Sequence, residues 1–452
     1  MSKVPTSIPA SEGPESPAPE ISRFKRLWNH QLLRNIVMLY GVQVSGYILP
    51  LIVLPYLSRV LSPEKFGVIA LAQSFMYYFM VLTDYGFNLT ATREIAIHCD
   101  DNKAVSRIFS AVMVCRFLLM FVGFVVMIAI VLATPKMRPN WSLFVICYLG
   151  VLGSVLFPLW LYQGLQKMQH IALRDLSAKA LGLIAIFVFV HSDRDYKLAA
   201  ALQPAGMVLS GLISLIMLQR VVPVRFEWPT WAEITIQMRE SWAVFVSLAA
   251  NTTYTSTNLV LLGLFAPPAT LAYFFNAFRV TVAIRSMVSP LVTAIYPHVS
   301  HIANRSAKDG ANFLKRYALL LSLPFFLVSV TLFISAPLLV KIVFGPKYAY
   351  TAVLLRIMAP GPFLFALSHC YSTYFMLAFG YQKQWSRLIL LTAVVNFAVL
   401  GPFLLLMSPS AAFASTGVAV DAFGLAMSYS FYRKHMHDHE LPREPAGAIS
   451  QG

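Results

Sequence analysis

Charged residues are scarce in this 452-residue chain: Asp, Glu, Lys and Arg make up 12% of it, about half the share of an ordinary soluble domain. Only four cysteines are present, which excludes a secreted scaffold held together by disulfides. Apolar residues are abundant, at 58% with a mean hydropathy of +0.67. A soluble fold of this size cannot bury that much apolar surface. The composition therefore indicates an all-α protein that crosses a membrane many times.

Motifs that would mark catalysis are missing as well. The chain has no GxxxxGK[ST] phosphate-binding loop, no HExxH and no GxSxG. The longest loop predicted on the outer side, residues 340–350, is too short to carry an active site. We therefore expect no enzyme, no cofactor and no metal site.

Twelve stretches are long and apolar enough to cross a bilayer, for which a helix needs about 20 mostly apolar residues. The predicted spans are 36–58, 66–88, 108–133, 141–163, 175–191, 198–218, 242–262, 271–298, 317–339, 351–378, 385–407 and 411–432. Residues 1–35 before them are predicted to form a disordered Pro/Ser-rich tail followed by a basic interfacial helix.

The basic residues predict the orientation of these spans. With the N-terminus in the cytoplasm, 23 Lys and Arg fall in the inner loops and tails and 8 in the outer loops. Because cytoplasmic loops collect Lys and Arg, this split predicts that both termini are cytoplasmic. It also explains most of the net charge of +16 without a nucleic-acid partner.

The two halves of the chain resemble each other. A proline turn joins the first two spans at Pro63, and another joins the seventh and eighth at Pro267–Pro268. The fourth span ends in GLQK and the tenth in GYQK, at 164–167 and 380–383. Parallel six-helix repeats predict two lobes with a substrate cavity between them. The predicted lobes are 36–218 and 242–432, joined by a cytoplasmic linker at 219–241 and followed by a cytoplasmic tail at 433–452.

Six charged residues fall inside the predicted spans. A charge at the bilayer centre costs about 2.5–3.5 kcal/mol on insertion scales, so such residues usually face a cavity or a partner. Arginines without a matching acid attract anions, because the guanidinium grips phosphate or carboxylate with two parallel hydrogen bonds. The six residues are Asp84, Arg116, Arg279, Arg285, Arg356 and Asp421. Of these we predict substrate binding for Arg279 and Arg285.

Uncharged polar residues form stripes on the first two helices of each predicted lobe. Asn276 and Ser286 share a helical face with Arg279, and the neighbouring spans carry further amides. Amides suit sugar hydroxyls, because they both donate and accept hydrogen bonds. The substrate therefore has an anionic group and a polar body. The predicted amide ligands are Asn276, Asn251, Asn258, Gln43 and Gln73.

The remaining intramembrane charges have both functional and structural explanations. Asp84, near the inner end of its span, pairs with Arg116 or Arg93, or it titrates during transport. Asp421 is either a proton or cation site or the partner of an arginine. Arg356 lies one turn from the outer end, where it either serves the cavity or extends to the membrane surface.

Several segments resemble the O-antigen flippases (Wzx type) of the multidrug/oligosaccharidyl-lipid/polysaccharide transporter superfamily. They are LPYLSRVLSPEKFGVIALAQSF (54–75), TDYGFNLTATREIA (83–96), WLYQGLQKM (160–168) and VFGPKYAYTAVLLRIMAP (343–360). The resemblance implies twelve helices in two six-helix bundles around a central cavity. It also implies a task, namely moving undecaprenyl-diphosphate-linked oligosaccharides across the bacterial inner membrane for polysaccharide biosynthesis. A polysaccharide polymerase would be a partner.

Two other functions remain open. A multidrug or cation antiporter of the same superfamily should place acids in its cavity, and here cations outnumber acids. A membrane polysaccharide polymerase or ligase needs a large outer loop, which is lacking. Because the sequence has no ATP site, a proton or sodium gradient or downhill substrate flux remains as the energy source.

Overall fold

The computed structural model describes residues 51–167, 172–221, 224–305 and 307–435, and within these ranges all regular structure is helical. The tail, the interfacial helix and Gln43 lie outside the described residues, as do residues 36–50 of the predicted span 36–58. The described part of that span is the short apolar helix Leu51–Val60.

The helices of the first half form one lobe, the N-lobe. They are α3 (Pro63–Asp84), α4 (Phe87–Ile97), α5 (Asn102–Ala133), α6 (Trp141–Leu156), α7 (Leu159–Gly164), α8 (Ala172–Phe189) and α9 (Tyr196–Val221).

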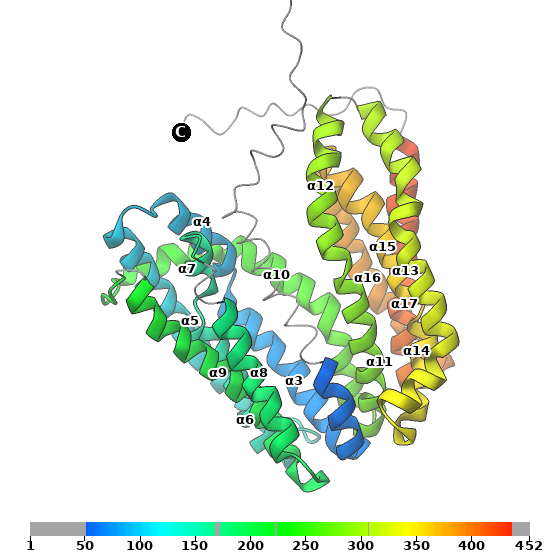
Figure 1. Cartoon of the computed structure of the whole chain (residues 1–452), viewed down its shortest axis with the longest axis horizontal. Helices are drawn as coiled ribbons and strands as arrows, with labels where there is room; N and C mark the ends of the chain where they lie inside the picture. The colour runs from blue at the N-terminus through cyan, green and yellow to red at the C-terminus, as the bar shows by residue number, and fades with distance from the viewer. Residues whose placement is uncertain (1–50, 168–171, 222–223, 306, 436–452) are drawn as a thin grey trace, which may run out of the picture.

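The helices after residue 267 form the other lobe, the C-lobe, and α10 (Trp231–Phe265) connects the two. The C-lobe contains α11 (Pro268–Ser286), α12 (Val288–Arg305), α13 (Ala307–Val343), α14 (Ala349–Met358), α15 (Gly361–Tyr371), the π-helical turn η5 (Ser372–Leu377), α16 (Gln382–Leu406) and α17 (Pro409–His435). Figure 1 shows the two lobes diverging from a shared end, like the arms of a V.

Helix α3 begins and ends at local signals in the sequence. The Ser62 hydroxyl accepts a hydrogen bond from the Lys65 N–H, and Pro63 occupies the first turn, where its missing N–H costs nothing. Tyr85 and Gly86 then adopt left-handed conformations with φ of 47° and 87°, which end the helix. The predicted span 66–88 is therefore a helix that stops at Asp84, followed by α4.

Three other predicted spans are interrupted. The span 141–163 breaks at Pro158 into α6 and α7, and the span 351–378 breaks at Pro360 into α14 and α15. The span 271–298 breaks at Met287, between α11 and α12. A proline lacks the N–H that an uninterrupted helix requires and clashes with the preceding turn, which explains the first two breaks. Pro290 removes a backbone donor just after the third break.

The predicted linker 219–241 contains the start of a long helix. Its second half is the beginning of α10, which runs without a break from Trp231 to Phe265. Thr230 and Glu233 form a reciprocal capping box that starts the helix, and no proline follows before its end. The predicted boundary at residue 242 therefore falls inside one continuous helix.

Helix α10 is hydrogen-bonded along the N-lobe. The Gln237 side chain donates to the Glu94 carboxylate over 2.7 Å. The Thr90 and Ser241 hydroxyls lie 2.7 Å apart. Nearer the shared end of the lobes, the hydroxyls of Tyr78 in α3 and Thr257 are 2.6 Å apart. Although α10 leads into the C-lobe, it is thus tied to N-lobe helices over most of its length.

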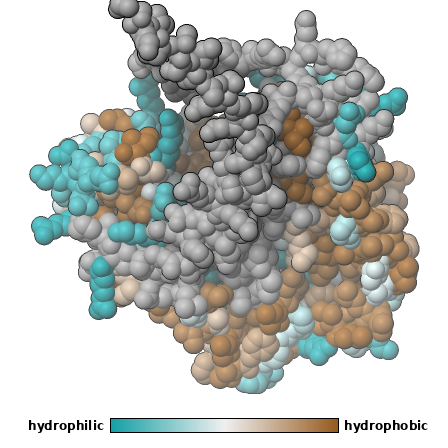
Figure 2. All heavy atoms as spheres, turned by 45° about the horizontal axis from the view of Figure 1, so that its top comes forward, coloured by the Kyte–Doolittle hydropathy of each residue, from teal (hydrophilic) through white to brown (hydrophobic). Residues whose placement is uncertain are grey.

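The outer surface of the helices is apolar. Eight described helical segments are long and apolar enough to cross a membrane, including Asn102–Ala133, Arg316–Val343 and Gln382–Leu406. Figure 2 shows apolar side chains over much of the visible C-lobe on the right, and hydrophilic ones around the end of the N-lobe on the left. Such large exposed apolar areas need lipid rather than water around them. The protein is a multi-pass membrane protein, and the count of twelve spans stays a prediction.

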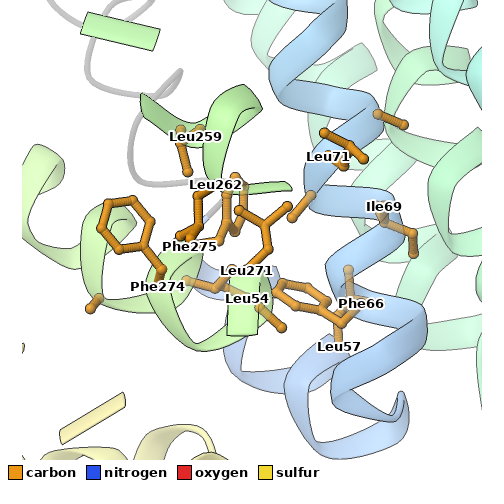
Figure 3. Close-up of a cluster of buried hydrophobic side chains, with 14 of the residues drawn as sticks. Leu54, Leu57, Phe66, Ile69, Leu71, Leu259, Leu262, Leu271, Phe274 and Phe275 are labelled. Atoms are coloured by element: carbon orange, nitrogen blue, oxygen red, sulfur yellow. The ribbon is translucent and has the colours of Figure 1, made fainter. Parts of the chain in front are cut away.

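The largest buried cluster joins the lobes at their shared end, which we call the closed end. Figure 3 shows Leu57 and Phe66 of the N-lobe packed towards Leu271 and Phe275 of the C-lobe. The rings of Phe66 and Phe275 meet edge to face with centroids 5.9 Å apart. This apolar cluster holds the lobes together next to the recess described below, whose polar side chains it positions.

Candidate functional site

A recess lies between the lobes beside the closed end. Its walls come from the helix Leu51–Val60, from α3 and α9 of the N-lobe, and from α11 of the C-lobe. Most of the lining is apolar, and the cavity volume is about 50 Å³, room for a few water molecules. The three polar side chains in the lining are Gln73, Gln203 and Arg279. Two of these were predicted to bind substrate.

Arg279 supplies the positive charge of the recess. Its guanidinium lies over the ring of Phe275, one turn earlier in α11, with 4.8 Å between the guanidinium carbon and the ring centroid. No carboxylate among the described residues forms an ion pair with it. Its N–H groups therefore face the recess with no described acidic neighbour, an arrangement suited to an anionic ligand.

Gln203 was not predicted from the sequence. It lies in α9 next to Pro204, and the Gln73 amide donates a hydrogen bond to its side-chain oxygen over 3.3 Å. Ser210 and Ser214 follow it on the same helical face, and this short polar stripe is the signal in the sequence that could have identified Gln203. A carboxamide inside a membrane helix is itself a signal, because an unsatisfied amide in hydrocarbon is costly.

Asn276 and Asn258 lie outside the recess, where they join helices. Asn276 is fully buried, and its amide donates to the Ser58 hydroxyl of the N-lobe over 3.1 Å. Asn258 of α10 exchanges two hydrogen bonds with Asn396 of α16, at 3.0 and 3.2 Å. Both amides contribute to helix packing in this conformation. Asn251 lies in α10, but its side chain is outside the described part, as is Gln43.

Arg285 and Asp421 form an ion pair inside the C-lobe. Both terminal nitrogens of the guanidinium donate to the carboxylate, and the guanidinium also lies 5.4 Å from the ring of Phe365. Gly361 makes room for the pair, because an added Cβ would lie 2.3 Å from the nearer guanidinium nitrogen. Of the alternatives for Asp421, the structure favours a partner for an arginine, and Arg285 is bound to that partner rather than lining the recess.

Asp84 and Arg116 line a second cavity of about 320 Å³, which lies inside the N-lobe and shares no lining residue with the recess. They form no direct ion pair. Arg116 instead donates to three backbone carbonyls, those of Thr83, Ser154 and Phe157. The Oδ1 atoms of Asp84 and Asn88 have no hydrogen-bond partner among the described residues.

Arg356 is exposed on the outside of the C-lobe. It donates to the Phe333 carbonyl over 3.2 Å, and its guanidinium lies 5.8 Å from the Phe333 ring. This placement suits a side chain that extends to the membrane surface and does not line the recess.

Polar contacts also join the lobes at the closed end. The Arg59 guanidinium donates to the Ile342 carbonyl, and the Lys347 ammonium donates to the Arg59 carbonyl over 3.3 Å. Lys136 of the N-lobe donates to the Ala266 carbonyl over 3.1 Å. These three hydrogen bonds hold the lobes together at the closed end, beside the recess.

A family model described as polysaccharide biosynthesis protein matches residues 32–303, more than half of the chain. The chain belongs to this family. Its sequence is 28% identical to a protein of Escherichia coli strain K12 named as a candidate O-antigen transporter, over 89% of this chain and 97% of that protein. A Shigella dysenteriae protein with the same name is 29% identical over 80% of this chain and 90% of its own length.

Two solved structures share the fold of this member of the polysaccharide biosynthesis family. One is an inward-facing multidrug-resistance transporter of the MATE family, with a TM-score of 0.68 and 13% identity over 89% of this chain and 98% of that one. The other is the lipid II flippase MurJ in an inward closed conformation, with a TM-score of 0.63 and 12% identity over 88% and 87%. Both proteins are all-helical transporters, which agrees with the all-helical fold predicted from the sequence.

Proposed function

We propose that this protein is a flippase, and not an enzyme, that moves undecaprenyl-diphosphate-linked oligosaccharide repeat units across the bacterial inner membrane for O-antigen or exopolysaccharide synthesis. It works by alternating access, with the lobes closing at one end and separating at the other. The observation that carries the proposal is the recess itself, where Arg279 stands without a described acid among apolar and amide side chains. A diphosphate that bears both a lipid and sugars has the matching chemistry.

Arg279 tests this function directly. A charge-assisted hydrogen bond to the diphosphate is worth about 1.5–3 kcal/mol, so losing it weakens binding by roughly ten- to hundredfold. Arg279→Lys keeps the charge but loses the planar fork, so we expect partial export, whereas Arg279→Ala should abolish it nearly completely. The measurement is polysaccharide export in a complementation assay, divided by protein abundance in the membrane. Full export by Arg279→Ala at normal abundance would contradict the proposal.

The second candidate function is a multidrug or cation antiporter, and the fold it shares with the MATE transporter is the observation in its favour. That likeness is one of fold alone. Among the described lining residues the recess has a cation and no acid, which disfavours cationic drugs as substrates. Drug-susceptibility assays distinguish the two: an antiporter lowers susceptibility to cationic drugs when overproduced, and the flippase does not.

Transport is coupled to a proton or sodium gradient in this proposal, with Asp421 or Asp84 as the responsive acid. An acid in a membrane helix can bind a cation in one conformation and release it in the other. Asp421→Asn and Asp84→Asn should each be tested for export at several external pH values, per unit of protein in the membrane. Unchanged export and pH dependence in both variants would refute the coupling.

Orientation belongs to the same proposal. Both termini lie in the cytoplasm, and the closed end faces the periplasm. Reporter fusions at Lys65, Lys136 and Pro268 should therefore report the periplasm, and fusions at Lys167 and Arg305 the cytoplasm. A polysaccharide polymerase that receives the flipped unit is the expected partner, and co-purification with it is the test.

A further inference from the structure

The hydrogen bond between Gln73 and Gln203 runs in one direction only. Gln73 donates through its amide nitrogen, and Gln203 accepts through its oxygen at 3.3 Å. The amide nitrogen of Gln203 has two N–H groups, and no described residue accepts from either. The one-way bond therefore points the Gln203 amino group away from its partner and leaves it available to a ligand.

A pair of amides that serves only packing looks different in this protein. Asn258 and Asn396 exchange hydrogen bonds in both directions, at 3.0 and 3.2 Å, so each oxygen and each nitrogen finds a partner. Gln73 and Gln203 line the recess instead, among mostly apolar side chains. Both side chains are half-buried, so the N–H groups of Gln203 that lack a described partner are accessible to a ligand in the recess.

The unused groups in the recess are mostly donors. Arg279 brings the five N–H groups of its guanidinium, Gln203 brings two, and Gln73 brings one more. Phosphate oxygens are the acceptors that such a set matches. The rest of the lining, including Leu54 and Val282, is apolar and suits a hydrocarbon chain next to the phosphate once the lobes separate and widen the recess, which here has room for only a few water molecules. The chemistry therefore favours a lipid diphosphate over free pyrophosphate.

We infer that Gln203 is a second ligand of the substrate diphosphate, positioned by Gln73, so that the anion is bound from both lobes at once. This inference rests on the proposed function. Gln203 lies in α9 of the N-lobe and Arg279 in α11 of the C-lobe, so their separation changes when the lobes move apart. A ligand held by both residues favours the conformation in which they are close. Substrate binding is thereby linked to the transport cycle.

The test is a binding titration on the purified full-length protein in lipid nanodiscs, with undecaprenyl diphosphate as the probe. Gln203→Met keeps the size but removes the donors, and we expect the affinity to fall about tenfold. Gln203→Glu adds a negative charge and should weaken binding further. Gln73→Met frees the Gln203 amide to turn and should have a smaller effect, about threefold. Gln382→Met, at an exposed position at the start of α16, is the matched control and should bind normally.

The outcomes separate this inference from the function on which it rests. If Arg279→Ala loses affinity while Gln203→Met and Gln203→Glu bind like the parent protein, the role of Gln203 is refuted and the flippase proposal stands. If Arg279→Ala also binds like the parent, the proposed site itself fails. Inorganic pyrophosphate is added as a competitor. If it displaces undecaprenyl diphosphate at concentrations similar to those of the lipid, the assignment to a lipid diphosphate is overturned. Tighter binding of undecaprenyl diphosphate by Gln203→Glu would show that residue 203 does not lie next to the diphosphate and would overturn the inference.

Discussion

Gly67 of α3 touches the backbone of Pro268 at the start of α11. A Cβ atom added to Gly67 would lie 1.8 Å from the Pro268 carbonyl oxygen, a distance that no real Cβ contact shows. Because the obstacle is backbone, no side chain can rotate away to make room. The two lobes thus meet at the closed end through a contact that only glycine permits.

Gly67→Ala should therefore hold the lobes apart at the closed end. The added methyl group overlaps the Pro268 carbonyl, so the conformation described here becomes unfavourable relative to one in which α3 and α11 separate. Double electron–electron resonance between spin labels at Glu64 and Lys341 measures that separation, and we expect a longer mean distance in the variant.

Gly401 provides a control, because it lies in α16 and a Cβ there meets nothing within 4 Å. Gly401→Ala should leave the distance distribution unchanged. An unaltered distribution in Gly67→Ala would show that this contact does not keep the closed end together.

Asn276→Ala should lower stability without changing affinity for a lipid diphosphate. The buried Asn276 amide bonds the Ser58 hydroxyl across the lobes, and leaving a buried polar partner unpaired costs about 1–3 kcal/mol. Ser58→Ala should have a similar effect, since it removes the other half of the same bond. Thermal unfolding and ligand titration on the same samples make the comparison. A large loss of affinity at normal stability would instead place Asn276 in the substrate site.

Removing one partner of the Arg285–Asp421 ion pair should destabilise the C-lobe more than replacing both partners with apolar residues. Asp421→Asn leaves an arginine in a largely buried position without its carboxylate, and the expected cost is about 3 kcal/mol. The double variant Arg285→Met with Asp421→Leu removes both charges and should recover much of that loss. Denaturation in mixed micelles gives the free energies of unfolding. Equal losses in the single and double variants would argue against a direct coupling of the two side chains.

The start of α10 should loosen in acid. Hydrogen bonds from the Thr230 backbone and hydroxyl hold the pKa of Glu233 below its ordinary value near 4.5. A lowered pKa means that the ionised carboxylate stabilises the capped turn fully above pH 4.5, and that this contribution disappears as the pH falls through the lowered value. A spin label at the exposed Ala232 should become more mobile in that range.

Glu233→Gln is the matched comparison for this titration. Its side chain still accepts hydrogen bonds from Thr230 but does not ionise, so label mobility should not change with pH over that range. If both proteins lose order at the same pH, the transition belongs to another group.

The pattern of apolar stretches was sufficient to predict a helical membrane protein, because the length of a span and the absence of charge are local properties of the chain. Interruptions were less predictable. Pro158 and Pro360 were visible in the sequence, yet whether a proline bends a span or divides it depends on the helices packed against it. The continuity of α10 was missed for a related reason, since the helix that starts at the Thr230 cap is bonded to distant helices of both lobes.

The candidate site was likewise predictable from the sequence only in part. Residue type and position identified Arg279 and Gln73 as unusual inside a membrane, and the structure brings both to one recess. Which charges have partners was decided by tertiary structure alone, because Arg285 and Asp421 are 136 residues apart and meet only when α11 and α17 pack together. Gln203 joined the site for the same reason. The sequence by itself determined which groups are costly to bury, and the packing of distant helices decided which of them satisfy one another and which remain for a ligand.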